Sequence, residues 1–148
     1  MNEYIEIEEF MGKTFVEVSA IGDNTALYFK TDTEVYKMFH EQDCCEEVYL
    51  DETHGDFTDL VGKPILRAEE SIKTMDDYTE EQLKDNDMGG EESFTWTFYN
   101  IATIKGDVQL KWYGGSNGYY SESISIKTIS IELYQKMKKD KVLEVLKE

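Results

Sequence analysis

At 148 residues the chain has the length of one domain, and 32 Asp and Glu against 15 Lys and Arg give a formal net charge of −17 at pH 7. A field this negative repels nucleic acid and anionic membranes and attracts basic protein surfaces, so we expect neither nucleic acid nor membrane as a direct partner. The hydrophobic fraction of 40% is too high for a disordered chain.

The first half of the chain predicts strands joined by turns. Apolar residues alternate with polar ones from Thr14 to Ala20, and turn signals at 22–24 and 31–33 separate this strand from strands at 25–30 and 34–40. We expect these three strands to form a meander. Residues 46–51 and 65–72 predict two further strands.

The stretch 75–92 differs from its surroundings, because acidic residues dominate it and few apolar residues recur at any period. We expect a mobile acidic loop with one helical turn at 79–84. Its carboxylates form the predicted acidic interaction surface: Asp76, Asp77, Glu80, Glu81, Asp85, Asp87, Glu91 and Glu92.

Residues 93–104 carry the clearest strand signal, since β-branched and aromatic residues dominate them. A turn at 105–107, a return strand at 108–112, a turn at Asn117-Gly118 and a strand at 120–126 complete a second predicted meander. The apolar alternation slips between Ile126 and Ile129, which predicts a bulge or a strand end there.

The C-terminal residues 130–148 predict a lysine-rich helix with a break near Lys139-Asp140. We therefore predict one α+β, mainly β domain over residues 1–148, in which two antiparallel meanders form a sandwich or a curled sheet with a C-terminal helix. The acidic N-terminus lacks the layout of a signal peptide, and no apolar run approaches 18 residues, so we expect a cytoplasmic protein.

The segment 40–46, His-Glu-Gln-Asp-Cys-Cys-Glu, contains residue types that bind zinc, but their spacing does not suit it. The adjacent thiols of Cys44 and Cys45 cannot staple distant parts of a fold, and on an extended strand they point to opposite faces. We expect Cys44 to be a small core residue, and we expect no metal, no cofactor and no catalytic residues.

The segment 112–121 combines glycines with aromatic residues. This composition suits a site for a nucleotide base and its phosphates, but it favours a tight hairpin with cross-strand aromatic pairs. If the two segments meet in space, they form a shared binding site of His40, Asp43, Trp112, Asn117 and Tyr119.

Both segments carry a resemblance, together with Gly55-Asp56, residues 59–62 and residues 68–70. Over Phe10–Lys127 the chain resembles a family of small uncharacterised proteins encoded by bacteriophages and prophages. The resemblance implies a phage accessory protein in the cytoplasm of a bacterial host, and it implies no activity.

Three functions follow as hypotheses. The first is a non-catalytic inhibitor that binds a basic surface of a host protein, as an anti-defence protein whose carboxylates stand in for phosphates. The second is a small-ligand module that sequesters a nucleotide signal, with Arg67, Lys105 and Lys111 as the nearest cations by sequence. The third is a structural or assembly component of the phage.

Overall fold

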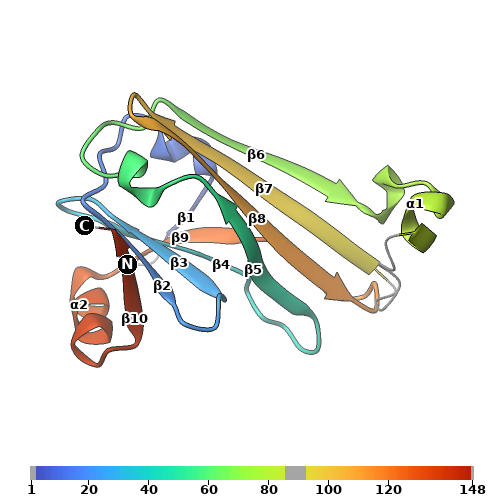
Figure 1. Ribbon diagram of the computed structural model, residues 1–148. Coiled ribbons are helices and arrows are strands. Elements are labelled where there is room, and N and C mark those ends of the chain that lie inside the picture. Colours follow the sequence, from blue (N-terminus) through green and yellow to red (C-terminus); the bar gives the residue numbers. More distant parts are fainter. Residues whose placement is uncertain (1–2, 86–92, 148) are drawn as a thin grey trace.

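The computed structural model describes residues 3–85 and 93–147 of the chain, with the elements shown in Figure 1. In chain order these are β1 (Tyr4–Ile5), η1 (Ile7–Phe10), β2 (Glu17–Ile21), β3 (Ala26–Lys30), β4 (Val35–Phe39), β5 (Glu47–His54), η2 (Phe57–Leu60), β6 (Arg67–Thr74), η3 (Met75–Asp77), α1 (Glu80–Asp85), β7 (Ser93–Thr103), β8 (Gly106–Ser116), β9 (Ser125–Ile129), α2 (Ile131–Lys139) and β10 (Leu143–Lys147). No helix in these residues is long and apolar enough to cross a membrane.

The strands form two antiparallel sheets that lie as two layers (Figure 1). One sheet has the order β1-β9-β4-β3-β2-β10, and the other has the order β5-β8-β7-β6. Side chains from both sheets fill the space between them, including Phe29, Met38, Tyr99, Leu110 and Trp112. The predicted fold class, α+β and mainly β with two packed sheets, is confirmed.

The predicted first meander is present as β2, β3 and β4, which pair in sequence order. The turns that the sequence indicates at 22–24 and 31–33 are the two connections. Strands from the far end of the chain then flank this meander, since β9 pairs with β4 and β10 pairs with β2.

The second predicted meander is correct for two strands and wrong for the third. The hairpin β7–β8 forms, but its neighbours are β5 and β6 from the first half of the chain. β9 pairs instead with β4 in the other sheet, and its register runs on to Ile129 opposite Val35. The two sides of β9 are both buried, because Ile126 faces the other sheet and Ile129 faces α2. The apolar alternation slips because β9 has apolar residues on both of its sides, and its pairing with β4 contains no bulge.

The predicted helix over 130–148 is also corrected. α2 ends at Lys139, close to the predicted break, and Lys141 then adopts a positive φ of 60° before β10 begins. Leu143 packs under α2, whereas Leu146 packs toward the space between the sheets. Pairing with the edge of β2 gives both side chains a buried surface, and this tertiary contact overrides the helical propensity of the segment.

Candidate functional site

The predicted segment 40–46 is organised around a buried contact between His40 and Glu46. His40 Nε2 lies 2.7 Å from Glu46 Oε2, and the two side chains are 4% and 0% exposed. His40 Nδ1 lies 2.6 Å from the carbonyl oxygen of Ser123. Both ring nitrogens are thus within hydrogen-bond distance of oxygen atoms, which fixes the orientation of the ring.

The backbone wraps around the Glu46 carboxylate. The amides of Asp43 and Cys44 donate to it over 2.9 Å and 2.8 Å. Burial raises the pKa of Glu46, but the hydrogen bonds from His40 and from these amides outweigh it, and the pKa falls from 4.5 to about 2. The segment therefore holds an ionised carboxylate in a fixed loop.

Cys44 and Cys45 lie at the bend of this loop, are exposed, and are joined to each other by a disulfide bond. The expectation that Cys44 is a core residue is wrong. The alternation of an extended strand, on which that expectation rests, does not hold where the backbone turns to reach the Glu46 carboxylate. Asp43 is exposed on the same bend.

The predicted segment 112–121 begins as the end of β8. Trp112 is fully buried among the residues between the sheets. Gly114 lies directly beneath residue 122, and a Cβ at this position would meet the Glu122 carbonyl oxygen at 2.8 Å. The buried carboxylate of Glu122 accepts hydrogen bonds from Thr95 and Ser116. This part of the motif thus holds the crossing from β8 to β9.

Asn117 and Tyr119 lie within the connection from β8 to β9, where no tight hairpin forms. Only Gly118 of the pair Asn117-Gly118 has a positive φ, and the Asn117 side chain accepts a hydrogen bond from the Tyr119 amide. The Tyr119 side chain is 83% exposed. The following residues lead to β9 in the other sheet, so the expected hairpin between these strands is replaced by a crossover.

The two predicted segments are neighbours in space. Val48 pairs with Gly114 across β5 and β8, and His40 bonds to Ser123. The five predicted side chains nevertheless face different surroundings. His40 and Trp112 are buried, whereas Asp43, Asn117 and Tyr119 are exposed.

A row of aromatic side chains crosses the outer face of the four-stranded sheet. Tyr49, Tyr113 and Trp96 stand opposite one another on β5, β8 and β7. Their ring centroids are 5.5 Å apart for Tyr49 and Tyr113 and 5.0 Å apart for Tyr113 and Trp96. Lys111 Nζ lies 4.3 Å from the Trp96 ring centroid. We call Tyr49, Trp96, Phe98 and Tyr113 the aromatic face.

The aromatic face is on the solvent side because the alternate residues of β7 turn inward. Thr97, Tyr99 and Ile101 are buried toward the core, whereas Trp96 and Phe98 are only half-buried. The sequence pattern separates these two sets of residues but does not identify the set that faces the core. The signal that could identify the core-facing set is the pair Tyr99 and Ile101, two large apolar side chains on the face that otherwise carries threonines.

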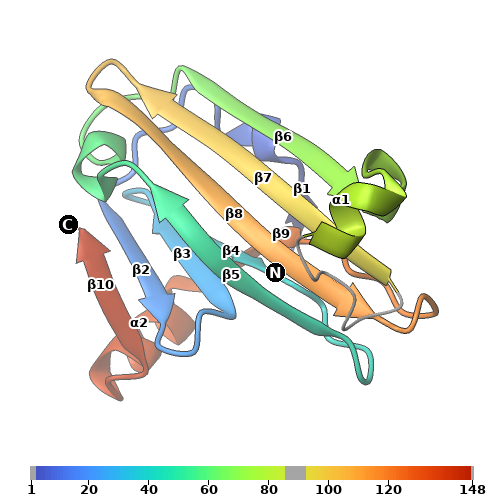
Figure 2. The ribbon, with the colours of Figure 1, turned by 45° about the vertical axis from the view of Figure 1, so that its right-hand side comes forward.

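Carboxylates lie at both ends of the aromatic face. On β5, burial raises the pKa of Tyr49, and the nearby Asp51 and Glu47 raise it further. At the other end, the Tyr78 ring lies 5.5 Å from the ring of Phe94, on the same side of β7. This contact holds η3 and α1 at the end of the sheet (Figure 2).

Only part of the predicted acidic surface can be placed next to the aromatic face. Asp76, Asp77, Glu80 and Glu81 are exposed beside the aromatic face. Asp85 ends α1, and Asp87, Glu91 and Glu92 lie outside the described residues. Within residues 3–85 and 93–147, no three His, Cys, Asp or Glu side chains are grouped so as to hold a metal ion.

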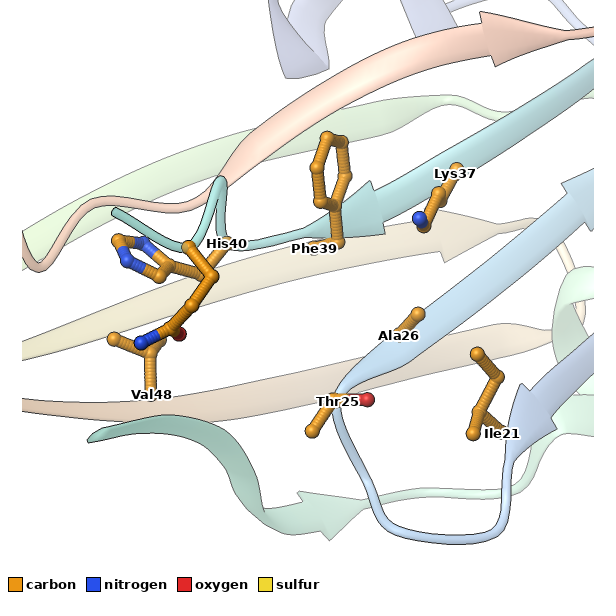
Figure 3. Close-up of a pocket in the computed structure, with 8 residues that line it drawn as sticks. Ile21, Thr25, Ala26, Lys37, Phe39, His40 and Val48 are labelled. Atoms are coloured by element: carbon orange, nitrogen blue, oxygen red, sulfur yellow. The ribbon is translucent and has the colours of Figure 1, made fainter. Parts of the chain in front are cut away.

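A cavity of about 300 Å³ opens near the end of β4 (Figure 3). Its lining includes Ile21, Ala26, Lys37, Phe39, Gln42 and Val48. Lys37 and Phe39 extend from β4, with Ala26 on the neighbouring strand β3. The cavity is thus at the end of β4, between Ala26 and Phe39, which belong to the apolar cluster under α2, and Val48 of β5 in the other sheet.

Comparison with known proteins places most of the chain in one family. Residues 8–126 match a domain of unknown function, DUF7448. No curated protein and no solved structure matches the chain.

Proposed function

The chain belongs to the DUF7448 family, and we propose that it is a non-catalytic acidic binding protein that docks a basic surface of another protein on its aromatic face. The observation that carries this proposal is a row of half-buried aromatic rings with carboxylates at both ends, in a chain of net charge −17.

The chemistry of the aromatic face suits arginine and lysine side chains. A guanidinium group stacks on tyrosine and tryptophan rings, and its N–H groups pair with carboxylates. Tyr49 lies beside Asp51 and Glu47, so both kinds of contact are within reach of one arginine. Lys111 already occupies a position over the Trp96 ring, which demonstrates the same contact within the chain.

Electrostatics favour a basic protein over a nucleic acid for this face. Exposed rings on an antiparallel sheet also suit the stacking of single-stranded bases. Lys73 and Lys111 lie near the rings, and the exposed carboxylates of β5 and of residues 76–81 oppose them. A chain with an excess of 17 negative charges repels a phosphate backbone over a long range and speeds association with a basic surface.

The resemblance carried by residues 40–46 and 112–121 supports a more specific role. We propose that the protein is a phage-encoded accessory protein that acts in the bacterial cytoplasm. There it occupies the nucleic-acid groove of a host enzyme, where its carboxylates take the places of phosphates. Such an inhibitor needs charge and a docking surface and requires no reaction.

A labelled arginine-rich peptide tests the docking surface. Fluorescence anisotropy is measured at about 50 mM and about 500 mM salt. We expect the peptide to bind at least tenfold more weakly at the higher salt concentration. At the lower salt concentration, Trp96→Ala and Tyr113→Ala should each weaken binding. Tyr119→Ala removes an aromatic ring that is 83% exposed and remote from this row in the sheet register, and serves as the matched control.

Two results would contradict the proposal. One is equal binding of the peptide by the wild type and by Trp96→Ala. The other is tighter binding of a single-stranded oligonucleotide than of the peptide, which would assign the rings to base stacking. Capture of proteins from a bacterial lysate on the wild type and on Trp96→Ala in parallel then tests the inhibitor role. A nucleic-acid-binding enzyme retained only by the wild type supports it.

A further inference from the structure

Two lysines stand directly opposite each other on the outer side of the six-stranded sheet. Lys37 of β4 pairs in register with Lys127 of β9. Like charges at directly opposite positions destabilise an antiparallel pair of strands. The arrangement is unusual in a chain where acids outnumber bases by more than two to one.

The charges of these two lysines are not neutralised within the described part of the chain. The ion pairs found there join Lys13 with Glu34 and Lys138 with Glu17, and the histidines His40 and His54 contact Glu46 and Glu52. Glu41 exerts a weaker attraction on Lys37 than the repulsion from Lys127. Its carboxylate accepts a hydrogen bond of 2.6 Å from the Tyr4 hydroxyl.

Both ammonium groups approach one aromatic ring. Lys37 Nζ lies 4.4 Å from the centroid of the Phe39 ring, and Lys127 Nζ lies 5.0 Å from it. The two charges are thus close to one ring, and their mutual repulsion accompanies the strand pairing. Burial lowers the pKa of Lys37, and Lys127 lowers it further.

The cavity of about 300 Å³ is lined by Lys37, the β4 member of this pair, and Lys127 stands opposite Lys37 on β9. Lys37 and Phe39 line one side of it, and Ile21, Ala26 and Val48 contribute apolar surface (Figure 3). Pockets for small ligands combine an apolar lining with a few charged groups, and this volume is at the lower end of their usual range. The site thus offers positive charge at one end and an apolar wall at the other.

We propose that this cavity binds a small organic anion, with its phosphate or carboxylate held by Lys37, whose positive charge Lys127 on the neighbouring strand reinforces, and its apolar part against Ile21, Ala26 and Val48. The bound anion supplies the counter-charge that the fold does not provide. The site differs from the docking surface above, because its two lysines are on β4 and β9 of the six-stranded sheet and the aromatic face is on the four-stranded sheet.

Four probes separate the contributions of charge and apolar surface in the full chain. They are phenyl phosphate, benzoate, inorganic phosphate and phenol, each titrated while NMR shifts of the backbone amides are followed. We expect phenyl phosphate or benzoate to bind more tightly than inorganic phosphate, and phenol not to bind. The shifted amides should include those of Ala26, Lys37 and Val48. The preferred probe identifies the anionic group.

The variants Lys37→Gln and Lys127→Gln test the role of the charges. Lys37→Gln should weaken binding of the preferred probe about tenfold, since it removes a charge-assisted hydrogen bond. Lys127→Gln should weaken binding less, since it removes only a neighbouring positive charge. Each should also raise the thermal midpoint of the ligand-free protein, because it removes the repulsion between opposite lysines. If the two lysines had a purely structural role, each substitution would lower the thermal midpoint of the ligand-free protein. Lys136→Gln removes one charge from the exposed face of α2 and serves as the control.

Three outcomes would overturn the proposal. The first is that none of the anionic probes shifts the amides that line the cavity. The second is that phenol binds as well as phenyl phosphate does. The third is that Lys37→Gln binds the anion as tightly as Lys136→Gln. Binding of the arginine-rich peptide is measured on the same variants, and its retention in Lys37→Gln would show that the two sites are separate.

Discussion

The carboxylate of Glu17 lies 2.6 Å from the ammonium group of Lys138, although 121 residues separate them in the chain. Glu17 is buried on β2, and Lys138 is in the last turn of α2. One turn earlier, the Tyr134 hydroxyl lies 2.7 Å from the Ser19 hydroxyl. These two contacts fix α2 against the outer side of the six-stranded sheet.

We predict that Lys138→Met destabilises the protein by about 1–3 kcal/mol, because it leaves a buried carboxylate without its partner. Urea unfolding followed by circular dichroism measures the change. Lys139→Met alters the next residue, which is exposed, and should change the free energy of unfolding by less than about 0.5 kcal/mol. Equal effects of the two substitutions would show that the ion pair does not hold the helix.

The Glu46 carboxylate gives the protein a defined acid sensitivity. Because folding lowers the pKa of Glu46 from 4.5 to about 2, the ionised form favours the folded state. This contribution is complete above pH 4.5 and is lost as the pH falls toward 2. We therefore expect the wild type to be more stable than Glu46→Gln at pH 7, and the difference to shrink at about pH 3.

Thermal unfolding of both proteins across this pH range provides the measurement. Glu47→Gln removes the same charge from the adjacent exposed position and controls for the change in net charge. A difference between wild type and Glu46→Gln that stays constant from pH 7 to pH 3 would contradict the assigned role of this carboxylate.

Gly114 is predicted to tolerate no side chain. In Gly114→Ala the new Cβ would lie 2.8 Å from the Glu122 carbonyl oxygen and 2.9 Å from the Glu122 Cβ, so the crossing from β8 to β9 must shift. We expect a loss of about 1–3 kcal/mol. Gly22→Ala meets no atom within 4 Å and should be close to neutral. Chemical unfolding of the two variants compares them directly.

The two tryptophans should differ in fluorescence. Trp112 is fully buried and Trp96 is half-buried, so Trp96→Phe should leave an emission that is shifted to shorter wavelength and resists quenching by acrylamide. Trp112→Phe should leave an emission that acrylamide quenches readily. The opposite order would mean that the faces of β7 and β8 are reversed.

Local patterns in the sequence predict the fold where strands pair with their neighbours in the chain. The meander of β2, β3 and β4 and the hairpin β7–β8 both follow from alternation and turn residues. The position of β9 does not, because its partner β4 is about 90 residues earlier in the chain. The alternation slip between Ile126 and Ile129 is a real signal, but a strand buried on both sides gives the same pattern as a bulge.

The candidate sites show a similar limit. The unusual composition of 40–46 and 112–121 draws attention to residues that the structure uses mainly to bury the carboxylates of Glu46 and Glu122. The paired lysines escape sequence reasoning, because Lys37 and Lys127 become neighbours only through the pairing of β4 with β9. To predict the aromatic face from the sequence, one must know which side of β7 is buried.

The strand order also constrains how the chain folds during synthesis. The meander of β2, β3 and β4 is complete once residue 39 has been added, yet the strands that cover its two edges, β9 and β10, follow only after residue 124. Until then both edges present unpaired backbone groups, which are prone to pair with other chains. Pairing across such distances in sequence folds slowly, on a timescale of about milliseconds to seconds. The nascent chain therefore passes through a long period in which its excess of acidic residues is the main protection against aggregation.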